Sequence, residues 1–533
     1  MSRAAKKQVV AFHPGSIVML AMFGVAGLSQ LKLQTIEAES TVREGEKSAK
    51  YTVTKIDKAR RGTLYTRDNA PLVTDSDSWM LSVNFAEIPK VPGFAVALSE
   101  ATGIPSHEFT NKEKGSRSWP DPLTPVQRRA VSKVKKAWDA DGISIERADR
   151  RSYPMGYLAG GLTGYYRVSN DAQKTVSMSG LEASLNEEMK GHNGKQTGLM
   201  DNHGEFLPLR SDDPSAIRKD GAKIVTTIDS NIQTAAALSV RKAVEENKAD
   251  DGVAIVVAPR TGEVLAMATW PCGNPNDTGN SKYDGKNPAY KTILEPGSTF
   301  KIFTMAKAYD AGKLKPGDTV NCQLTLGIDS KSAIHCDRAH GAHGVVDAEA
   351  ALAKSCNVAA AIWALKVGQK DFYGFLGDLG LRSKSEIEIN GEAKNQMAID
   401  PWARRLQTAT WGFGQSMNVT PISLARALCV IANGGHRVPL TLLRSVDGKE
   451  VMPKIQSERV LSEEACKFTL DNMKAVMQHG TGQSLQIAGF DMGGKTGTAQ
   501  KLGKGGSGGY VSNFVGVIPA ENPEAVVLVM INN

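Results

Sequence analysis

Between residue 221 and the end of the chain, strand-like segments come first and last, and helix-like segments lie between them. The early apolar runs are 224–229, 253–257 and 264–268, and the late ones are 514–518 and 525–531. The stretch from about 298 to 435 is mostly helical in pattern. This order predicts an antiparallel sheet that is covered by helices, an α+β domain.

The chain is too long for one domain. Its 533 residues predict two or three domains. A composition of 41% hydrophobic and 23% charged residues permits a large core. The net charge of +8 is mild, and such a balance does not predict nucleic-acid binding. We therefore expect a globular protein of several domains with no nucleic-acid partner.

The N-terminus has the pattern of an anchoring or targeting segment. Three basic residues among the first seven precede an uncharged stretch, residues 15–31, whose length is near the lower limit for a membrane-spanning helix. The basic residues before this stretch predict a cytoplasmic tail over 1–13 and a transmembrane anchor over 14–32, with the bulk of the chain outside. A cleavable signal peptide is the alternative, because small residues follow the apolar core, although no clean cleavage site is present.

Residues 33–220 carry no reactive constellation of side chains. Residues 37–50 are polar and charged, and short strands around a turn are predicted over 51–85. A charged, exposed helix is expected over 125–140. We therefore interpret 33–220 as a structural, interaction-bearing module and place the chemistry in 221–533.

A serine and a lysine three residues apart follow the early strands. Pro296 and Gly297 break the backbone, and residues 298–311 are predicted to form a helix. Ser298 and Lys301 then lie on one face, and burial among apolar neighbours would lower the lysine pKa so that it could accept the serine proton. The alternative is a capping serine and a surface lysine. The same spacing also occurs at Ser29 with Lys32 and at Ser132 with Lys135.

Two further motifs follow in chain order. One is Ser355 with Asn357, and the other is the run Lys495, Thr496, Gly497 and Thr498. The Ser-x-Asn spacing also occurs at Ser416 in the same interval, but an alanine-rich helix ends at Ser355, which suits a turn that points side chains into a cleft. Together the three elements are the signature of penicillin-binding proteins and class A β-lactamases.

On these motifs the chain resembles a class B penicillin-binding protein, a membrane-anchored peptidoglycan D,D-transpeptidase. The resemblance runs from about Tyr51 to the last residue. It also includes Arg61 with Gly62 and Arg67, Arg151 with Tyr153 and Pro154, and residues 226–229, 274–276 and 411–421. Within the class, residues 412–414 and 419–421 are more similar to division-specific (septal) members than to elongation-specific ones.

The resemblance implies an α+β architecture in three parts. A single N-terminal transmembrane helix leads into an elongated mixed pedestal domain over 33–220, which is similar to dimerisation domains. The transpeptidase domain over 221–533 is expected to be an antiparallel sheet flanked by helices, as in serine β-lactamases, and to be truncated at its C-terminus relative to the family. Thr66, Asp68 and Asn69 depart from the family's pedestal motif.

By resemblance, four residues would make and break an acyl-enzyme. Ser298 would attack the carbonyl between the two terminal D-alanines of a stem peptide. Lys301 would take its proton as a neutral amine, with its pKa lowered by burial and by the charge of Lys495. Ser355 would relay the proton to the leaving D-alanine, and Asn357 would hold the substrate amide.

The resemblance also implies a binding strand and an oxyanion hole. Lys495, Thr496 and Thr498 on an edge strand would bind the substrate carboxylate, and Gly497 would let the substrate backbone approach without a Cβ clash. The backbone N–H groups of Ser298 and Thr498 would form the oxyanion hole. No cofactor and no metal is implied for the reaction.

The implied function is cross-linking of stem peptides during cell-wall synthesis at the division septum, with β-lactams acylating Ser298. The implied partners are stem peptides, β-lactams, a membrane glycosyltransferase of the shape, elongation, division and sporulation family, and other division proteins at the bacterial inner membrane. Elongation-specific transpeptidation and D,D-carboxypeptidation are alternatives within the fold. A β-lactam sensor or a scaffold of wall synthesis is the non-enzymatic alternative, and the intact motif set argues against it.

The cysteines leave three possibilities open. Six cysteines are few for an exported protein of this size, so disulfides are not expected to stabilise the fold as a framework. Cys322 and Cys336 bracket a short loop and could form one bridge. With His343 and Cys356 they also make a Cys3His set that could bind zinc, although the tight Cys-x-x-Cys pairs of common zinc modules are missing. Free thiols are the third possibility.

A phosphate-binding loop is a rival interpretation of the last motif. Residues 489–496 match the pattern Gly-x-x-x-x-Gly-Lys-Thr. Such a loop must open a helix, whereas the glycine-rich run after Lys495 cannot form a stable one. We therefore do not expect nucleotide binding.

Overall fold

The computed structural model describes most of the chain. The described residues are 14–35, 52–76, 78–110, 115–119, 123–147, 150–168, 176–200, 206–208, 216–277, 286–336, 341–397, 404–452, 458–500 and 509–533. The chain divides into two compact units, one of residues up to 59 with 192–220 and the other of residues 60–191 with 221–533. The predicted domain boundary at residue 221 stays a prediction.

The first unit contains a helix and a small sheet. Helix α1 spans Pro14–Thr35 and includes the predicted anchor segment, whereas the predicted tail 1–13 and the polar stretch 37–50 lie outside the described residues. Within the described part of the chain, we find no helix with both the length and the apolarity needed to cross a membrane. The sheet is antiparallel, in the order β1 (Thr52–Asp57), β10 (Gly194–Met200) and β11 (Phe206–Pro208).

In the second unit, one mixed sheet joins strands from distant parts of the sequence. Its order is β21 (Lys449–Glu450), β20 (Leu443–Val446), β12 (Lys223–Thr226), β2 (Thr63–Tyr65), β3 (Pro71–Ser76) and β7 (Arg150–Ser152). Next to this sheet, the buried carboxylate of Glu182 lies 2.8 Å from Arg61 and 2.6 Å from Arg151. The two guanidinium groups therefore share one buried negative charge.

A smaller lobe of the same unit has its own core. The strands β5 (Ser116–Ser118), β4 (Trp79–Asn84) and β6 (Ile143–Arg147) form an antiparallel sheet beside α3 (Pro92–Thr102) and α4 (Pro125–Ala137). Apolar side chains such as Leu81, Phe94 and Val131 form its core. Helix α4 begins at a capping box of Thr124 and Gln127, and it is the charged helix that the sequence predicts.

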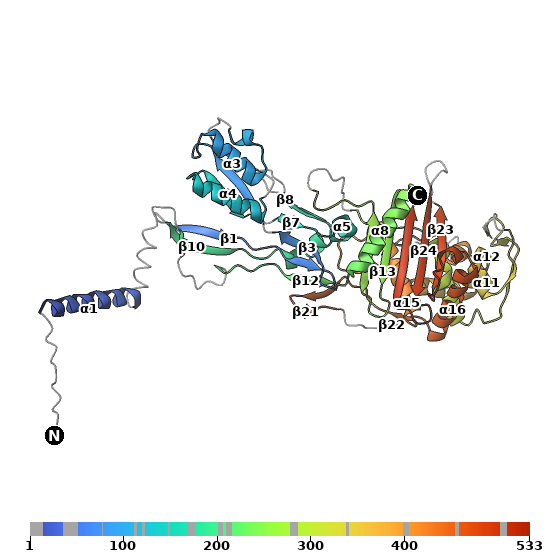
Figure 1. Ribbon diagram of the computed structural model, residues 1–533. Coiled ribbons are helices and arrows are strands. Elements are labelled where there is room, and N and C mark those ends of the chain that lie inside the picture. The colour runs from blue at the N-terminus through green and yellow to red at the C-terminus, as the bar shows by residue number, and fades with distance from the viewer. Residues whose placement is uncertain are drawn as a thin grey trace, which may run out of the picture. The chain divides into compact units, whose positions relative to one another are not determined.

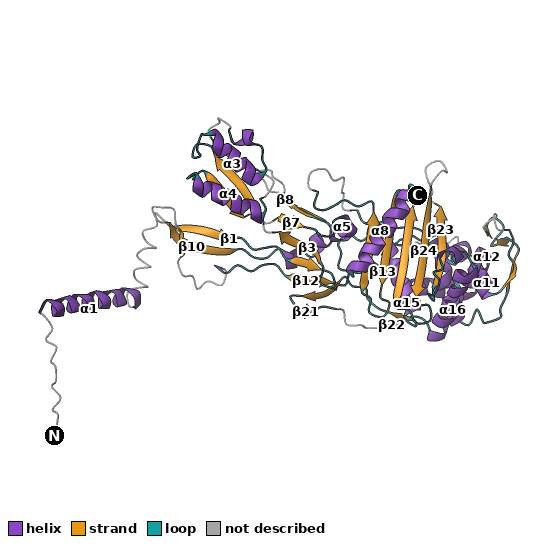
Figure 2. Cartoon of the chain, viewed as in Figure 1, coloured by secondary structure: helices purple, strands orange, loops and turns teal. Residues whose placement is uncertain are grey.

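The second unit contains a five-stranded antiparallel sheet. Figures 1 and 2 label three of its strands, β13, β24 and β23. Its order is β14 (Val264–Trp270), β13 (Asp251–Val257), β25 (Ala525–Asn532), β24 (Tyr510–Ile518) and β23 (Gly493–Gln500). The last two strands of the chain therefore lie between the early β13–β14 hairpin and β23, which is an edge strand. The predicted α+β domain with an antiparallel sheet is confirmed.

Helices cover both faces of this sheet (Figure 1). Because side chains alternate along a strand, Ala254 and Val529 pack against α8 (Ser230–Asn247), whereas Val253, Ile255 and Leu528 join the main core on the other face. The helices that contribute to that core include α10 (Lys301–Asp310), α11 (Ala348–Ala353), α12 (Asn357–Val367), α13 (Gln369–Asp378), α14 (Arg404–Trp411), α15 (Pro421–Ala432) and α16 (Glu463–His479).

The helix predicted over 298–311 has a different start. Residues Gly297–Phe300 form a 3-10 turn, and the α-helix α10 begins only at Lys301. The predicted helix is therefore present, but its first turn is a 3-10 turn. In a 3-10 turn the side chains three residues apart lie directly above one another, which brings Ser298 and Lys301 closer than an α-helix would.

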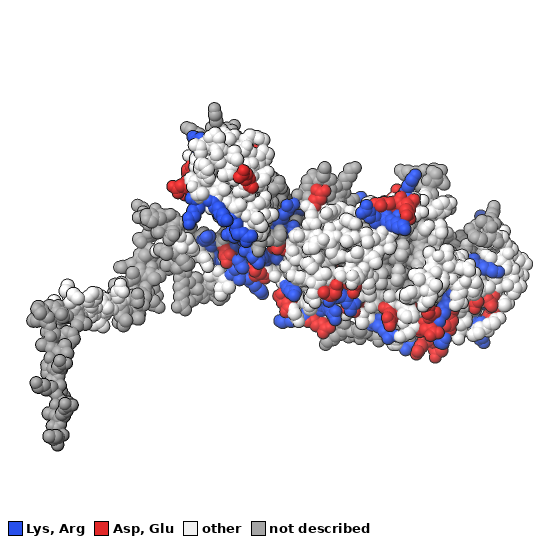
Figure 3. Space-filling model, in the orientation of Figure 1, with Lys and Arg blue, Asp and Glu red and all other residues white. Residues whose placement is uncertain are grey.

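Charged side chains of both signs are interspersed on the face that Figure 3 shows. This mixture agrees with the mild net charge of +8.

Candidate active site

Two glycines in contact shape the turn that carries Ser298. The N–H of Gly297 donates to the carbonyl oxygen of Gly414 at 2.9 Å. A Cβ on Gly414 would lie 2.2 Å from the carbonyl oxygen of Gly297, so only glycine allows this approach. Gly297 itself has a φ of 57°, which glycine adopts without strain. The resulting 3-10 turn leaves Ser298 partly exposed, whereas the next two residues, Thr299 and Phe300, are buried.

The amine of Lys301 lies at the centre of the candidate site. Its Nζ is 2.8 Å from Ser298 Oγ, 2.9 Å from Ser355 Oγ and 2.7 Å from the carbonyl oxygen of Ser355. A neutral amine has two N–H donors and one lone pair. It can therefore donate to both oxygens of Ser355 and accept the proton of Ser298.

Burial favours that neutral form. Lys301 is 1% exposed, and burial lowers its pKa to about 7, although charge on the Cys356 and Cys336 thiols acts in the opposite direction. The pKa of Lys495 is also well below its ordinary value. The larger cause is burial of the side chain, and the second is the nearby charge of Lys301. From the sequence we expected burial and the charge of Lys495 together to lower the pKa of Lys301. The structure places burial first, and the repulsion between the two ammonium groups also disfavours charge on Lys495.

Ser355 occupies the sharp turn that the sequence predicts for it. It lies between the end of α11 and the start of α12 and has a φ of 56°, a conformation that is uncommon for a residue with a side chain. This turn aims both the hydroxyl and the carbonyl group at Lys301. The alternative serine, Ser416, has its hydroxyl 3.0 Å from that of Thr410 instead. The structure therefore groups Ser298, Lys301 and Ser355.

Strand β23 brings the third motif to the site. It packs against the 3-10 turn, and its Lys495 side chain is fully buried. Lys495 Nζ lies 3.0 Å from the carbonyl oxygen of Thr496 and 3.4 Å from the hydroxyl of Thr481. The hydroxyl oxygen of Thr481 also lies 2.7 Å from the hydroxyl oxygen of Thr496. Thr481 was not predicted, and the only signal for it is its place between two glycines directly after a long helix.

Gly497 has a packing role that the sequence did not predict. A Cβ at this position would lie 2.1 Å from Asn513 Oδ1 and 2.9 Å from Thr299 Cγ2. Asn513 donates in turn to the carbonyl oxygen of Pro296 at 3.1 Å. The missing side chain therefore makes room for the protein's own 3-10 turn, and the predicted close approach of substrate at Gly497 stays a prediction.

Two predicted site residues are not bonded to the Ser298 group. Asn357 is the first residue of α12, and its Nδ2 donates to the carbonyl oxygen of His335 at 2.9 Å. Thr498 lies on the exposed edge of β23, opposite Ser512 of β24. Asn357 lies two residues after Ser355, and Thr498 lies on the same strand as Lys495. Their predicted roles toward substrate stay predictions.

The rival phosphate-binding loop does not match the fold. Such a loop opens a helix at its lysine, whereas residues Gly493–Gln500 form strand β23. The N–H groups of Lys495 and Thr496 therefore belong to a sheet and not to the start of a helix.

None of the six cysteines, all of which lie in the described part of the chain, forms a disulfide in this structure. Cys322 and Cys336 do not form the bridge that was one of the predicted alternatives, although their sulfurs are 3.5 Å apart. Both lie in a cluster with His343 and Cys356, and Cys356 is the residue between Ser355 and Asn357.

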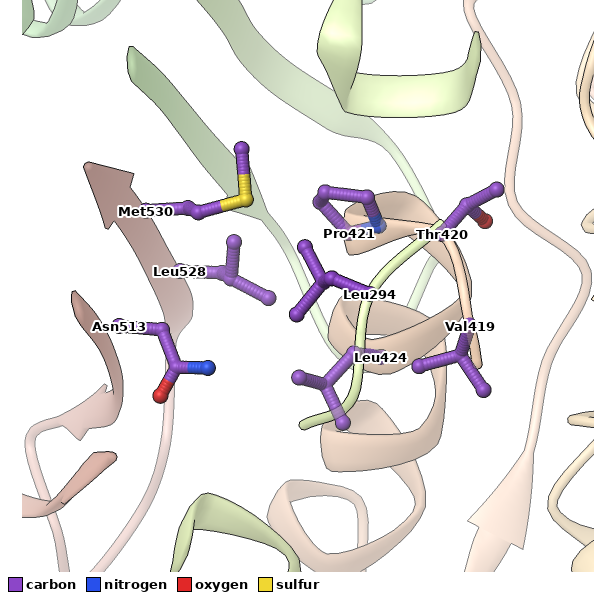
Figure 4. Close-up of a pocket in the computed structure, with 8 residues that line it drawn as sticks. All are labelled: Leu294, Val419, Thr420, Pro421, Leu424, Asn513, Leu528 and Met530. Carbon is purple, nitrogen blue, oxygen red and sulfur yellow. The ribbon is translucent and has the colours of Figure 1, made fainter. Parts of the chain in front are cut away.

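A small pocket lies between β25 and the start of α15. Figure 4 shows its lining, which is mostly apolar and includes Leu294, Leu424 and Leu528. None of the residues with a predicted catalytic role lines it, so we regard it as part of the core.

Known proteins share both parts of this architecture. A family model described as the penicillin binding protein transpeptidase domain matches residues 252–533, and one described as the penicillin-binding protein dimerisation domain matches residues 56–226. The chain is 29% identical to the probable peptidoglycan D,D-transpeptidase PenA of Neisseria meningitidis, over 94% of this chain and 84% of that protein. It is 27% identical to the peptidoglycan D,D-transpeptidase FtsI of Escherichia coli, over 94% of this chain and 83% of that protein.

A solved structure shows the same fold at lower identity. Penicillin binding protein 2X from Streptococcus thermophilus has a TM-score of 0.75 and 22% identity, with 90% of this chain and 77% of that chain covered. The transpeptidase family model alone covers more than half of the chain. The chain therefore belongs to the class B penicillin-binding proteins, the peptidoglycan D,D-transpeptidases.

Proposed function

We propose that this chain cross-links peptidoglycan stem peptides through an acyl-enzyme on Ser298, during wall synthesis at the division septum. The observation that carries the proposal is the contact between Lys301 Nζ and Ser298 Oγ, at 2.8 Å, in a place where burial lowers the lysine pKa to about 7. A base whose pKa is near the working pH is efficient, because it is available unprotonated and still binds a proton well.

In the first step, Ser298 Oγ bonds to the carbonyl carbon of the penultimate D-alanine of a stem peptide. Its proton passes to Lys301 Nζ. The C–N bond to the terminal D-alanine then breaks, and the leaving nitrogen takes a proton from Ser355 Oγ, which regains one from Lys301 across 2.9 Å. The products are an ester on Ser298 and free D-alanine.

In the second step, the amine of a neighbouring stem peptide attacks the ester carbonyl. The C–O bond to Ser298 breaks, and the proton released by the amine returns to Ser298 Oγ through Lys301. The result is an amide cross-link and the original enzyme. A β-lactam acylates the same oxygen, because opening of its ring also breaks a C–N bond, and it thereby blocks the site.

The remaining motif residues hold the substrate. Lys495, Thr496 and Thr498 bind the terminal carboxylate, and the arriving negative charge favours the charged form of Lys495. The N–H groups of Ser298 and Thr498 stabilise the oxyanion, and Asn357 holds the peptide amide. These roles rest on the resemblance and on the positions of the residues along β23 and α12.

The N-terminal segment 14–32 anchors the chain in the bacterial inner membrane, with the tail 1–13 in the cytoplasm. The basic residues before the segment support this proposal, as do the exposed apolar side chains of Met22, Phe23 and Leu28 on α1, which are 68–70% exposed. A membrane glycosyltransferase and other division proteins are the expected partners. Release of the full chain from membranes by alkaline carbonate would contradict the anchor, and a fluorescent fusion spread along the lateral wall would contradict the septal role.

The direct test compares two serines with the same spacing to a lysine. Ser132 precedes Lys135 by three residues, but its hydroxyl donates to Arg128 and Lys135 Nζ donates to Ile143. Ser298→Ala should abolish both labelling by fluorescent penicillin and release of D-alanine from a pentapeptide, whereas Ser132→Ala should leave both unchanged. Labelling that survives in Ser298→Ala would remove the proposed nucleophile. If the wild type releases D-alanine but never forms cross-links, the reaction is carboxypeptidation.

A further inference from the structure

Four side chains with metal-binding atoms converge beside the candidate active site. Their ligand atoms all lie within 4.8 Å of one another. Cys322 ends β15 (Val320–Cys322), Cys336 follows β17 (Ala333–His335), His343 precedes β18 (Gly344–Val346) and Cys356 caps α12. Strands β15 and β18 pair so that Cys322 lies opposite Gly344. Residues far apart in the sequence therefore meet at one point.

Three of the distances between these atoms are close to those in a tetrahedral zinc site. The sulfurs of Cys322 and Cys336 are 3.5 Å apart, those of Cys336 and Cys356 are 3.7 Å apart, and Cys322 Sγ is 3.5 Å from His343 Nδ1. Zinc with Zn–S bonds of about 2.3 Å and a Zn–N bond of about 2.0 Å separates two sulfurs by about 3.8 Å and a sulfur from a nitrogen by about 3.5 Å. Three thiolates with one imidazole are also ligands that zinc prefers.

A disulfide accounts for fewer of these groups. One bridge would join two of the sulfurs and leave the third cysteine and the imidazole turned toward it without a function. All three cysteines are buried, at no more than 3% exposed. In addition, the N–H of Ala359 donates to Cys356 Sγ at 3.4 Å. Such N–H donors to sulfur orient and support metal-bound thiolates.

We propose that these four side chains bind one Zn²⁺ ion, which fixes the turn of Ser355 and Asn357 in the candidate active site. Binding releases one proton from each of the three thiols to solvent. The metal site itself does not depend on the proposed function. Its effect on acylation does rest on that function, and the experiments below separate the two.

Two of the proposed zinc ligands are sequence neighbours of residues that shape the candidate active site. Cys356 lies between Ser355 and Asn357, and Cys336 directly follows His335. The carbonyl oxygen of His335 accepts a hydrogen bond from Asn357 Nδ2 at 2.9 Å. A metal that joins Cys336 to Cys356 therefore closes a small ring that contains this hydrogen bond. It would hold Ser355 in its left-handed conformation, with a φ of 56°, while substrate binds.

The first experiment measures zinc and thiols in the full chain, purified without chelator. The expected result is one zinc per chain by mass spectrometry of the metal, and six titratable thiols per chain after denaturation with chelator, one for each of the six cysteines. Four thiols without zinc would mean a disulfide, and six thiols without zinc would mean free cysteines. Either result would overturn the proposal. Replacement of zinc by Co²⁺ should give the absorption of a tetrahedral cobalt thiolate.

Matched variants locate the ion. Cys322→Ser and His343→Ala should lower zinc affinity at least roughly tenfold. Cys429→Ser and Cys466→Ser remove thiols that are equally buried but lie elsewhere, in α15 and α16, and they should keep one zinc per chain. Loss of zinc from these controls alone would overturn the assignment. The wild-type counts need no variant, so they decide the question even if a variant fails to fold.

The second experiment tests the positioning role. Removal of zinc from the folded chain should slow acylation by fluorescent penicillin on the order of tenfold to a hundredfold, and added zinc should restore it. An unchanged rate after zinc loss would overturn the positioning role. Failure of the zinc-loaded, folded wild type to acylate at all would contradict the proposed function and leave the metal site standing.

Discussion

The rate of acylation should follow the titration of Lys301. Burial lowers the pKa of this lysine from 10.5 to about 7, with thiol charges at Cys356 and Cys336 acting against the shift. At about 1.4 kcal/mol per pKa unit, the fold disfavours the charged amine by roughly 5 kcal/mol. Raising the pH through 7 converts the ammonium into the neutral base, so acylation should become faster as the pH rises.

The expected profile is specific. With a pKa of about 7, roughly one amine in a hundred is neutral at about pH 5 and roughly nine in ten at about pH 8. Rapid-quench measurements with fluorescent penicillin should therefore show a rate that falls about tenfold per pH unit below 7 and levels off above about 8. A lysine with its ordinary pKa would give a rate that still climbs at about pH 9. That result, or a flat profile, would refute the reasoning.

Two variants of one helix separate the base from its surroundings. Lys301→Met keeps the length of the side chain, and acylation should fall between about a hundredfold and ten-thousandfold and lose its pH dependence. Lys307→Met is the control, because Lys307 lies on the same helix, with its Nζ 3.8 Å from Asp310, and its loss should leave the profile unchanged.

The pH dependence of stability is a second measurement of the Lys301 pKa. Between pH 7 and 10.5 the unfolded lysine binds the proton more tightly than the folded one, so the wild type should gain stability as the pH rises, and Lys301→Met should lose this gain.

Two further predictions concern packing and buried charge. A Cβ on Gly497 would lie 2.1 Å from Asn513 Oδ1, so Gly497→Ala should lower the free energy of unfolding by about 1–3 kcal/mol and slow acylation. Gly374→Ala, which adds a methyl group in open space, should do neither in urea unfolding and penicillin labelling. Glu182→Gln removes the charge shared by two buried guanidinium groups and should lower the free energy of unfolding by about 3–5 kcal/mol, whereas the exposed Glu187→Gln should change it little. Equal losses in that pair, measured in urea at neutral pH, would contradict the role given to burial.

Much of the fold could be predicted because it depends on the order of apolar segments. Early and late strands with helices between them can bury their apolar faces in one sheet, and the five-stranded sheet has this arrangement. The sequence also predicted the turn at Ser355, since a short helix of alanines ends before it. What it could not predict is the 3-10 turn at Ser298, because that turn depends on a contact between Gly297 and Gly414.

The rest of the site depends on distances through space. Thr481 reaches Lys495 because α16 ends beside β23, and its place between two glycines after a long helix is a weak local signal for that contact. The contact of Gly497 with Asn513 and Thr299 could not be predicted, because the sequence does not tell which face of an edge strand points inward. The cysteines were open to three interpretations for the same reason. Their pairing is set by where β15, β17 and α12 meet, and not by their spacing in the chain.

The central claim is that one hydroxyl, on Ser298, forms the covalent bond. Trypsin cleavage after Lys291 and Lys301 would release residues 292–301, a peptide in which Ser298 is the only serine. Mass spectrometry of the full chain after reaction with penicillin should show one adduct per chain, and fragmentation should place it on Ser298 in this peptide. An adduct on any other peptide, or no adduct on a folded chain, would contradict the account.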